Sequence, residues 1–354
     1  MATMQAVMLT KKGGPEVLEV VELPLPEPGP GEVRVKVRAT GVGATDITMR
    51  RGSYPYAPPI PFVPGYESVG IVDAVGAGVT SLREGDRVCA LLVYGGYATH
   101  VVRGAEHWAK VPDGLDDVQA VSLILNYVTA YQMIHRKAQL QPGQWALVNA
   151  ANGGVGQALL DLLRAHGVSA IGAAANARHG IVTSYGAIPI EGRSTPLDVG
   201  VHAVRAEGVD AAFDGVGGTH TGQCVSSTHR GGTTVWYGFM GARGFPAVAR
   251  SALSLFVGAR LRGRNGRFYG ITLLYRKNSQ PFREDLPKLF ELLAQRKISP
   301  RIARTFPLLD ARKANERLEA GGIDGKLVLV TRENRAGANR SFQPPAFGRA
   351  ELQR

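Results

Sequence analysis

The stretch from Trp145 to Gly156 limits what this chain can fold into more than any other. It reads WALVNAANGGVG, an apolar run and a glycine-rich turn that open a helical pattern over residues 153–167. Such a turn lets backbone N–H groups and the positive end of a helix dipole approach a pyrophosphate. The spacing G-x-G-x-x-G is met in its second and third positions, and alanine stands in the first. A dinucleotide-binding turn is predicted, with a purely structural turn as the alternative; its cofactor-binding residues would be Ala151, Gly153, Gly154, Val155 and Gly156.

After this turn, strand-like and helical segments alternate as far as about residue 260. The strand patterns lie at 169–174, 188–190, 209–218 and 233–239. Alternation at this spacing predicts βαβ units and a parallel sheet. Ligands meet such sheets at the ends of the strands. The glycines in two of these turns, Gly217 and Gly238, are therefore expected to line the cofactor site.

The first 120 residues show short strand patterns instead. Residues 32–39, EVRVKVRA, alternate apolar and charged side chains, as in a strand with one buried face. Similar runs lie at 68–76 and 86–102, and the strand pattern KLVLV follows much later, at 326–330. Residues 331–354, rich in Arg, Asn, Pro and Gly, are predicted to form a disordered tail.

Length and composition are typical of two globular domains. A chain of 354 residues is longer than a single hydrophobic core usually supports. Its 2 cysteines can build neither a disulfide framework nor a four-cysteine zinc site. The start resembles no signal peptide, and no apolar run reaches the roughly 20 residues that span a membrane. We therefore expect a cytoplasmic protein that does not associate with membranes.

The net charge of +12 is concentrated in one part of the chain. Residues 259–304 hold 12 basic and 3 acidic side chains, whereas residues 1–258 are balanced. A basic segment can bind nucleic acid, but aromatic residues that would stack on bases are few here: Phe268, Tyr269 and Tyr275. Nucleic acid is the less favoured partner, and an acidic substrate carrier or a subunit contact is the alternative.

The residues after the second strand of the parallel sheet indicate which dinucleotide binds. NAD sites usually place an acidic residue about 20 residues beyond the glycine turn, where it binds the ribose 2′-OH. No acid occurs between Asp161 and Glu191, and Arg178 and His179 follow the strand instead. A cation suits a 2′-phosphate. We predict NADPH, bound in part by Arg178, with a solvated helix arginine as the alternative.

Several motifs together resemble the medium-chain dehydrogenase/reductase superfamily. They are AANGGVG, GPEVLEVVELPLPEPGPGEVRVKVRATGV (14–42), PFVPGYESVGIVDAVGAGV (61–79), EGDRV (84–88) and GKLVLV (325–330). The glycine turn is similar to that of the zinc-independent quinone oxidoreductase branch, which includes zeta-crystallin. The resemblance implies an α/β fold with a GroES-like β-rich catalytic domain and a doubly wound Rossmann domain, and it implies a homodimer. We expect the catalytic domain at 1–120 and 262–330, and the Rossmann domain at 121–261.

The motifs that bind catalytic zinc in the alcohol dehydrogenase branch are altered in this chain. Its G-V-C-G-T-D motif corresponds to Gly41–Asp46, with Gly43 in place of the cysteine. Its G-H-E motif corresponds to Gly65-Tyr66-Glu67, with Tyr66 in place of the histidine. Because a catalytic zinc needs about three protein ligands, we expect no metal. Gly43 also departs from the quinone oxidoreductase pattern, which has asparagine there.

The resemblance also assigns site residues, each with a structural alternative. Tyr54, in the G-x-Y-P segment, and Tyr127 are candidate catalytic hydrogen-bond donors, although each could be a packed aromatic residue. Asp46 matches a family motif but could equally cap a helix. Thr129, in T-A-Y, and Lys326, in G-K-x-V-L, are expected near the cofactor; a surface lysine is the alternative for Lys326.

The function implied is hydride transfer from NADPH to a quinone or an α,β-unsaturated carbonyl, without zinc. The protein would hold the acceptor and stabilise the developing enolate oxygen with hydrogen-bond donors. Two alternatives remain open. One is an enoyl-thioester reductase of lipid or polyketide metabolism, with 259–304 binding the carrier phosphates. The other is a non-catalytic NADPH-binding protein, which Gly43 would favour.

Overall fold

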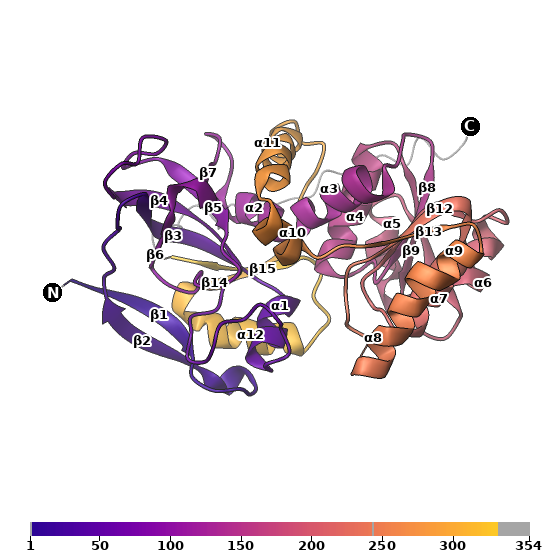
Figure 1. Ribbon diagram of the computed structural model, residues 1–354, viewed down its shortest axis with the longest axis horizontal. Helices are drawn as coiled ribbons and strands as arrows, with labels where there is room; N and C mark the ends of the chain where they lie inside the picture. Colours follow the sequence, from indigo (N-terminus) through magenta and orange to yellow (C-terminus); the bar gives the residue numbers. More distant parts are fainter. Residues whose placement is uncertain (1, 243, 332–354) are drawn as a thin grey trace.

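The computed structural model describes residues 2–242 and 244–331, which form two domains with helices between them. Figure 1 shows the N-terminal strands, in indigo and purple, on one side and the parallel sheet on the other. The final strands, in yellow, return to the first domain. The predicted tail at 332–354 lies outside the described residues.

A seven-stranded sheet forms most of the catalytic domain. Its path is β14-β15-β3-β4-β5-β7, and β6 also pairs with β3. As the alternation predicts, Val33, Val35 and Val37 are fully buried on one face of β3. β15 runs antiparallel to β3, so the end of the chain completes a sheet begun near its start. The strands are β3 (Glu32–Val42), β4 (Glu67–Val75), β5 (Arg87–Leu91), β6 (His100–Gly104), β7 (Ala109–Lys110), β14 (Ile302–Pro307) and β15 (Lys326–Val330), beside the hairpin of β1 (Thr3–Leu9) and β2 (Leu18–Pro24).

The second domain is a parallel six-stranded sheet in the order β10-β9-β8-β11-β12-β13. The strand order reverses between β8 and β11, and in sheets of this kind ligands bind at the carboxyl ends of the strands on either side of such a switch point. The strands are β8 (Trp145–Asn149), β9 (Ser169–Ala174), β10 (Ile188–Glu191), β11 (Val209–Asp214), β12 (Thr228–Trp236) and β13 (Asn265–Phe268). The helices are α4 (Gly154–Ala165), α5 (His179–Thr183), α6 (Leu197–Val204), α7 (Thr219–Ser227), α8 (Phe245–Ala252) and α9 (Ala259–Leu261).

One domain boundary differs from the sequence prediction. β13 pairs with β12, so residues 265–268 belong to the Rossmann sheet and not to the catalytic domain predicted from 262. The sequence of β13, NGRF, contains a single apolar residue and therefore carries no strand pattern. The chain leaves the Rossmann sheet only after Phe268.

Helices between the two sheets join the domains (Figure 1). A helical segment over 117–138 begins at Asp116, whose side chain accepts from the N–H groups of Val118 and Gln119 at 2.9 and 3.0 Å. It consists of α2 (Asp117–Ser122), a π-helical turn (Leu123–Tyr127), α3 (Val128–Gln132) and a second π-helical turn (Met133–Ala138). The remaining helices are α1 (Ala44–Arg50), α10 (Ile271–Lys277), α11 (Gln280–Ala294) and α12 (Ala311–Glu319).

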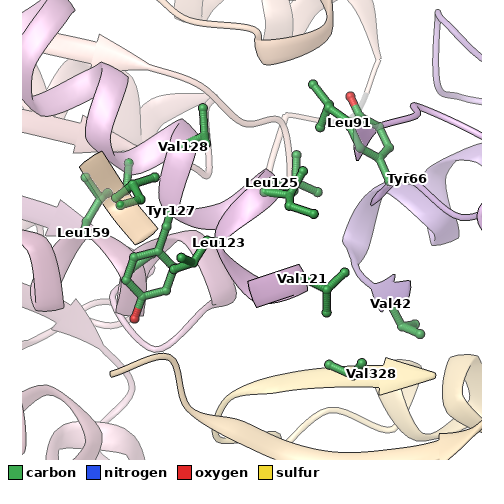
Figure 2. Close-up of a cluster of buried hydrophobic side chains, with 14 of the residues drawn as sticks. Val42, Tyr66, Leu91, Val121, Leu123, Leu125, Tyr127, Val128, Leu159 and Val328 are labelled. Atoms are coloured by element: carbon green, nitrogen blue, oxygen red, sulfur yellow. The ribbon is translucent and has the colours of Figure 1, made fainter. Parts of the chain in front are cut away.

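A single apolar core runs across the domain junction. Figure 2 shows side chains from both domains meeting around the joining helix: Tyr66 and Leu91 from one side, Leu159 from the other, and Leu125 between them. All four are buried. Because this core is shared, the two domains cannot separate without exposing apolar surface to water.

Candidate functional site

The glycine turn after β8 has the geometry that a phosphate cradle requires. Ala150 has a left-handed backbone with φ 59°, and Gly153 N–H donates to its carbonyl oxygen at 3.0 Å. A Cβ on Gly156 would overlap that same oxygen, so only glycine lets α4 start this close to the strand. Gly153 precedes α4 without a side-chain cap, and Gly154 is exposed. The first N–H groups of α4 thus face an open cradle, which fits a dinucleotide pyrophosphate.

The loops after β11 and β12 lie against each other at the same edge of the sheet. A Cβ on Gly238 would overlap the carbonyl oxygen of Gly215, and Gly217 has a left-handed backbone with φ 78°. Asp214 orders this turn, since its carboxylate accepts from Val216 and Gly217 N–H groups at 2.9 and 3.1 Å. The predicted residues Gly217 and Gly238 therefore lie at the strand ends where a cofactor would pass.

The strand end that Arg178 follows also holds an acid, which comes from the neighbouring strand. Arg178 is half-buried at the end of β9, and its guanidinium lies beside Gly322. Glu191 reaches the same strand end from β10, where its carboxylate accepts from the N–H groups of Asn176 at 3.1 Å and Arg193 at 2.7 Å. These backbone hydrogen bonds, that from Arg193 first, lower the pKa of Glu191. A linear count from the glycine turn misses this carboxylate, because it belongs to the next strand.

Lys326 forms a buried ion pair. Its Nζ lies 2.5 Å from Oε1 of Glu67, and neither side chain is more than 6% exposed. The other carboxylate oxygen of Glu67 accepts the backbone N–H of Leu125 at 2.6 Å. The alternative of a surface lysine is therefore wrong. The Lys326 ammonium also faces Gly43, where a Cβ would lie 3.9 Å from Nζ.

A small cavity of about 20 Å³ lies between Lys326 and the glycine turn. Gly154 and Gln157 of α4 line one side, and Lys326 and Arg301 line the other. Asn126 lies at the cradle itself, because its Nδ2 is 2.7 Å from where a Cβ of Gly154 would stand. The structure thus brings Lys326 and the start of α4 to one place.

Asp46 occupies the first turn of α1. Its Oδ2 accepts the backbone N–H of Gly43 at 2.8 Å, across the start of the helix. Burial raises the pKa of Asp46 to about 6, against the opposing effects of the Gly43 hydrogen bond and of Lys326. This geometry is that of the helix-capping alternative.

The two predicted tyrosine donors lie in different surroundings. The hydroxyl of Tyr127 is buried and donates to Oδ2 of Asp161 at 2.8 Å. Figure 2 shows the hydroxyls of Tyr127 and Tyr66 pointing away from each other. Tyr54 is only half-buried, and its hydroxyl lies 2.6 Å from that of Tyr66 and 2.7 Å from Oγ1 of Thr272. Tyr54 thus belongs to a hydroxyl cluster, whereas Tyr127 is already occupied within the core.

The side chains at two of the zinc-ligand positions, Tyr66 and Glu67, have partners within the protein. Tyr66, in place of the histidine, contacts Tyr54 and Thr272 through its hydroxyl, and Glu67 is held by Lys326. Within residues 2–242 and 244–331, no three His, Cys, Asp or Glu side chains are placed to hold a metal ion. The two substitutions are evident from the motifs, but Thr272 is not, because it follows β13 in a stretch without a recognisable motif. Thr129, expected near the cofactor, is buried in α3.

A glycine cradle at the switch point of a parallel sheet, beside a GroES-like domain, defines a nucleotide-dependent dehydrogenase fold. Family models agree: residues 29–113 match the alcohol dehydrogenase GroES-like domain, and residues 187–329 match the zinc-binding dehydrogenase family. The chain belongs to the medium-chain dehydrogenase/reductase superfamily.

Three relatives indicate the branches to which the chain is similar. It is 32% identical to the mouse synaptic vesicle membrane protein VAT-1 homolog-like over 92% of this chain and 81% of the relative. It is 27% identical to the quinone oxidoreductase of Pongo abelii, over 92% and 98%. A mycobacterial protein solved in complex with NADPH is 31% identical, with a TM-score of 0.80, and the match covers 92% and 99% of the two chains.

The buried ion pair yields a stability prediction. Lys326→Met leaves the Glu67 carboxylate buried without its cation, so we expect the free energy of unfolding to fall by about 3–5 kcal/mol in urea titrations. The double variant Glu67→Gln, Lys326→Met should lose less, because no uncompensated charge remains. Lys313→Met, which removes an exposed lysine paired with Asp310, is the matched control and should change stability by less than about 1 kcal/mol. A loss at Lys326 no larger than at Lys313 would contradict the assignment.

The raised pKa of Asp46 predicts that the difference in stability between Asp46→Asn and the wild type depends on pH. The folded protein retains the Asp46 proton up to about pH 6, whereas an unfolded aspartate loses it near 3.9. The contribution of protonated Asp46 to the free energy of unfolding is fully present below about pH 4 and is lost as pH rises through about 6. Asp46→Asn cannot ionise, so its stability relative to wild type should rise by about 2 kcal/mol between pH 4 and pH 7.5. Urea unfolding of both proteins across this range measures the effect, and a pH-independent difference would refute it.

Proposed function

We propose that the chain is an NADPH-dependent oxidoreductase that transfers hydride, without zinc, to a quinone or an α,β-unsaturated carbonyl. One observation carries the proposal: the side chains at two zinc-ligand positions, Tyr66 and Glu67, are bonded to partners within the protein, while the half-buried side chain of Tyr54 places its hydroxyl beside that of Tyr66. An acceptor oxygen would therefore meet a hydrogen-bond donor. The similarity to quinone oxidoreductases supports the same acceptor class.

Different residues of the chain would bind the cofactor and the acceptor. The bound nicotinamide would supply the hydride. The first N–H groups of α4 would hold the pyrophosphate, and Thr129, Gly217, Gly238 and Lys326 would line the rest of the cofactor cleft. Tyr54 would donate a hydrogen bond to the acceptor oxygen as negative charge develops on it. Burial raises the pKa of Tyr54, against the opposing hydrogen bonds of Thr272 and Tyr66, so the phenol stays protonated at neutral pH.

An enoyl-thioester reductase is the second candidate, and the position of α10 favours it. Arg276, from the basic stretch, lies over the ring of Tyr56 with its Cζ 5.3 Å from the ring centroid. The Tyr56 ring is in turn 5.8 Å from that of Tyr54. The basic segment therefore reaches the proposed acceptor site, where a phosphate or carboxylate of a substrate could meet it.

Turnover measurements test the function directly. We expect NADPH consumption with 9,10-phenanthrenequinone or a simple enone, and a preference for crotonyl-CoA would favour the thioester alternative. Tyr54→Phe should lower kcat/KM by about 100-fold, because one oxyanion donor is lost. Tyr94→Phe, which removes a tyrosine hydroxyl outside the cluster, should retain activity. NADPH binding without turnover of any of the three acceptors would instead mean a non-catalytic binding protein.

NADPH is our proposed cofactor because Arg178 follows β9 where a 2′-phosphate would lie. The NADPH complex of the mycobacterial relative supports the same nucleotide class. Glu191 lies at the same strand end, but two backbone N–H groups already bind its carboxylate. Its charge is thereby partly compensated, and Arg178 provides the cation for the phosphate.

Measurements of nucleotide binding separate the role of Arg178 from that of Glu191. Arg178→Ala should raise the Kd for NADPH by about tenfold or more and leave NADH almost unchanged, since NADH has no 2′-phosphate. Glu191→Gln is the matched control and should not weaken NADPH. Isothermal titration with both nucleotides measures this, and equal losses for NADPH and NADH would remove Arg178 from the phosphate site.

The homodimer remains a proposal from the family resemblance, for which the mass in solution is the test. Apolar side chains are exposed on the segment 245–261 beside β13, the last strand of the Rossmann sheet: Phe245, Leu253, Phe256, Val257 and Leu261.

We also propose a cytoplasmic location. No helix of the described part of the chain is long and apolar enough to cross a membrane.

A further inference from the structure

The hydroxyl cluster brings together three segments that are far apart in the chain. Tyr54 lies in the loop after α1, Tyr66 directly precedes β4, and Thr272 lies in the first turn of α10. Tyr54 contacts both other hydroxyls, at 2.6 and 2.7 Å, and Tyr66 and Thr272 contact each other. Since α10 follows the last strand of the Rossmann sheet, the cluster joins the catalytic domain to a helix between the domains (Figure 1).

Burial makes the three members unequal. Tyr66 is 1% exposed and Thr272 is 2% exposed, whereas Tyr54 is half-buried. Of these three described residues, Tyr54 is therefore the one that a substrate can reach. The buried hydroxyls must find their partners within the cluster, because an unpaired buried hydroxyl is costly.

Counting hydrogens shows what the arrangement does when a ligand arrives. Each hydroxyl has one hydrogen to donate and can accept two. In the free protein the three hydrogens can close a ring in which every member donates once. When Tyr54 turns its hydrogen outward, the two buried hydroxyls form a chain that ends on the Tyr54 oxygen. Each donor in such a chain polarises the next, so Tyr54 becomes a stronger donor.

We propose that Tyr66 and Thr272 are positioning residues that fix the Tyr54 hydroxyl and direct its hydrogen toward the carbonyl oxygen of the acceptor. This inference rests on the proposed reductase function. Neither residue touches substrate; both act through Tyr54. The substrate class follows from the chemistry, because a single outward-pointing O–H recognises a carbonyl or quinone oxygen on which negative charge develops.

Variants of Thr272 and Tyr66 test the proposal in turnover. Thr272→Val removes the hydroxyl at nearly constant volume and should lower kcat about five- to tenfold with KM little changed, the effect of one neutral hydrogen bond. Thr272→Ser should restore activity, and Tyr66→Phe should resemble Thr272→Val. Thr183→Val, on the exposed surface of α5, is the control. Combined with Tyr54→Phe, Thr272→Val should add nothing further, because it acts through the Tyr54 hydroxyl.

A binding measurement separates failure of this proposal from failure of the proposed function. 4-Nitrophenolate carries an oxyanion like that of the enolate, and its absorbance reports binding in the presence of NADP⁺. We expect Tyr54→Phe to weaken binding about tenfold or more, Thr272→Val about fivefold, and Thr272→Ser not at all. If the wild type reduces no acceptor, the function fails and this titration still judges the cluster. Equal affinity in all variants, or fully additive losses of kcat, would overturn the positioning role.

Discussion

The buried ion pair between Glu67 and Lys326 ties together the parts of this fold. Glu67 opens β4, Lys326 opens the final strand β15, and the same carboxylate accepts the N–H of Leu125 in the helix that joins the domains. One carboxylate thus connects three segments separated by most of the chain. Its burial makes any arrangement that leaves it unpaired costly. The register of the returning strand and the position of the joining helix are therefore set together, at the edge of the cavity beside the glycine turn.

The same pair relates the altered zinc motif to structure. In this chain Glu67 follows Tyr66, and each side chain has a partner within the protein. Tyr66 reaches the hydroxyl cluster, and Glu67 reaches Lys326. Gly43, the other altered position, leaves space in front of the Lys326 ammonium. A hydroxyl cluster and an ion pair thus occupy the region of the altered zinc motifs.

Local pattern, taken with the family resemblance, predicted most of the architecture from the sequence. The alternation in residues 32–39 identified β3, and the glycine turn after Trp145 located the start of α4 and the switch point. The strand KLVLV at the end of the described chain, taken with the family resemblance, indicated the discontinuous domain. The boundary at 262 was wrong because β13 is a short strand with one apolar residue. Its place in the sheet depends on pairing with β12, which no local pattern encodes.

The site was less predictable because its residues act through partners distant in the chain. Tyr54 and Thr272 are 218 positions apart, and Glu191 reaches the backbone N–H of Asn176, two residues before Arg178, from a different strand. Tyr54 and Tyr127 look alike as sequence, two tyrosines in family motifs, yet burial and a carboxylate partner separate them. A half-buried phenol backed by two buried hydroxyls can donate outward, while a phenol already bonded to Asp161 cannot do so without breaking that bond. The difference between the two phenols is thus a property of packing, which their sequence motifs do not reveal.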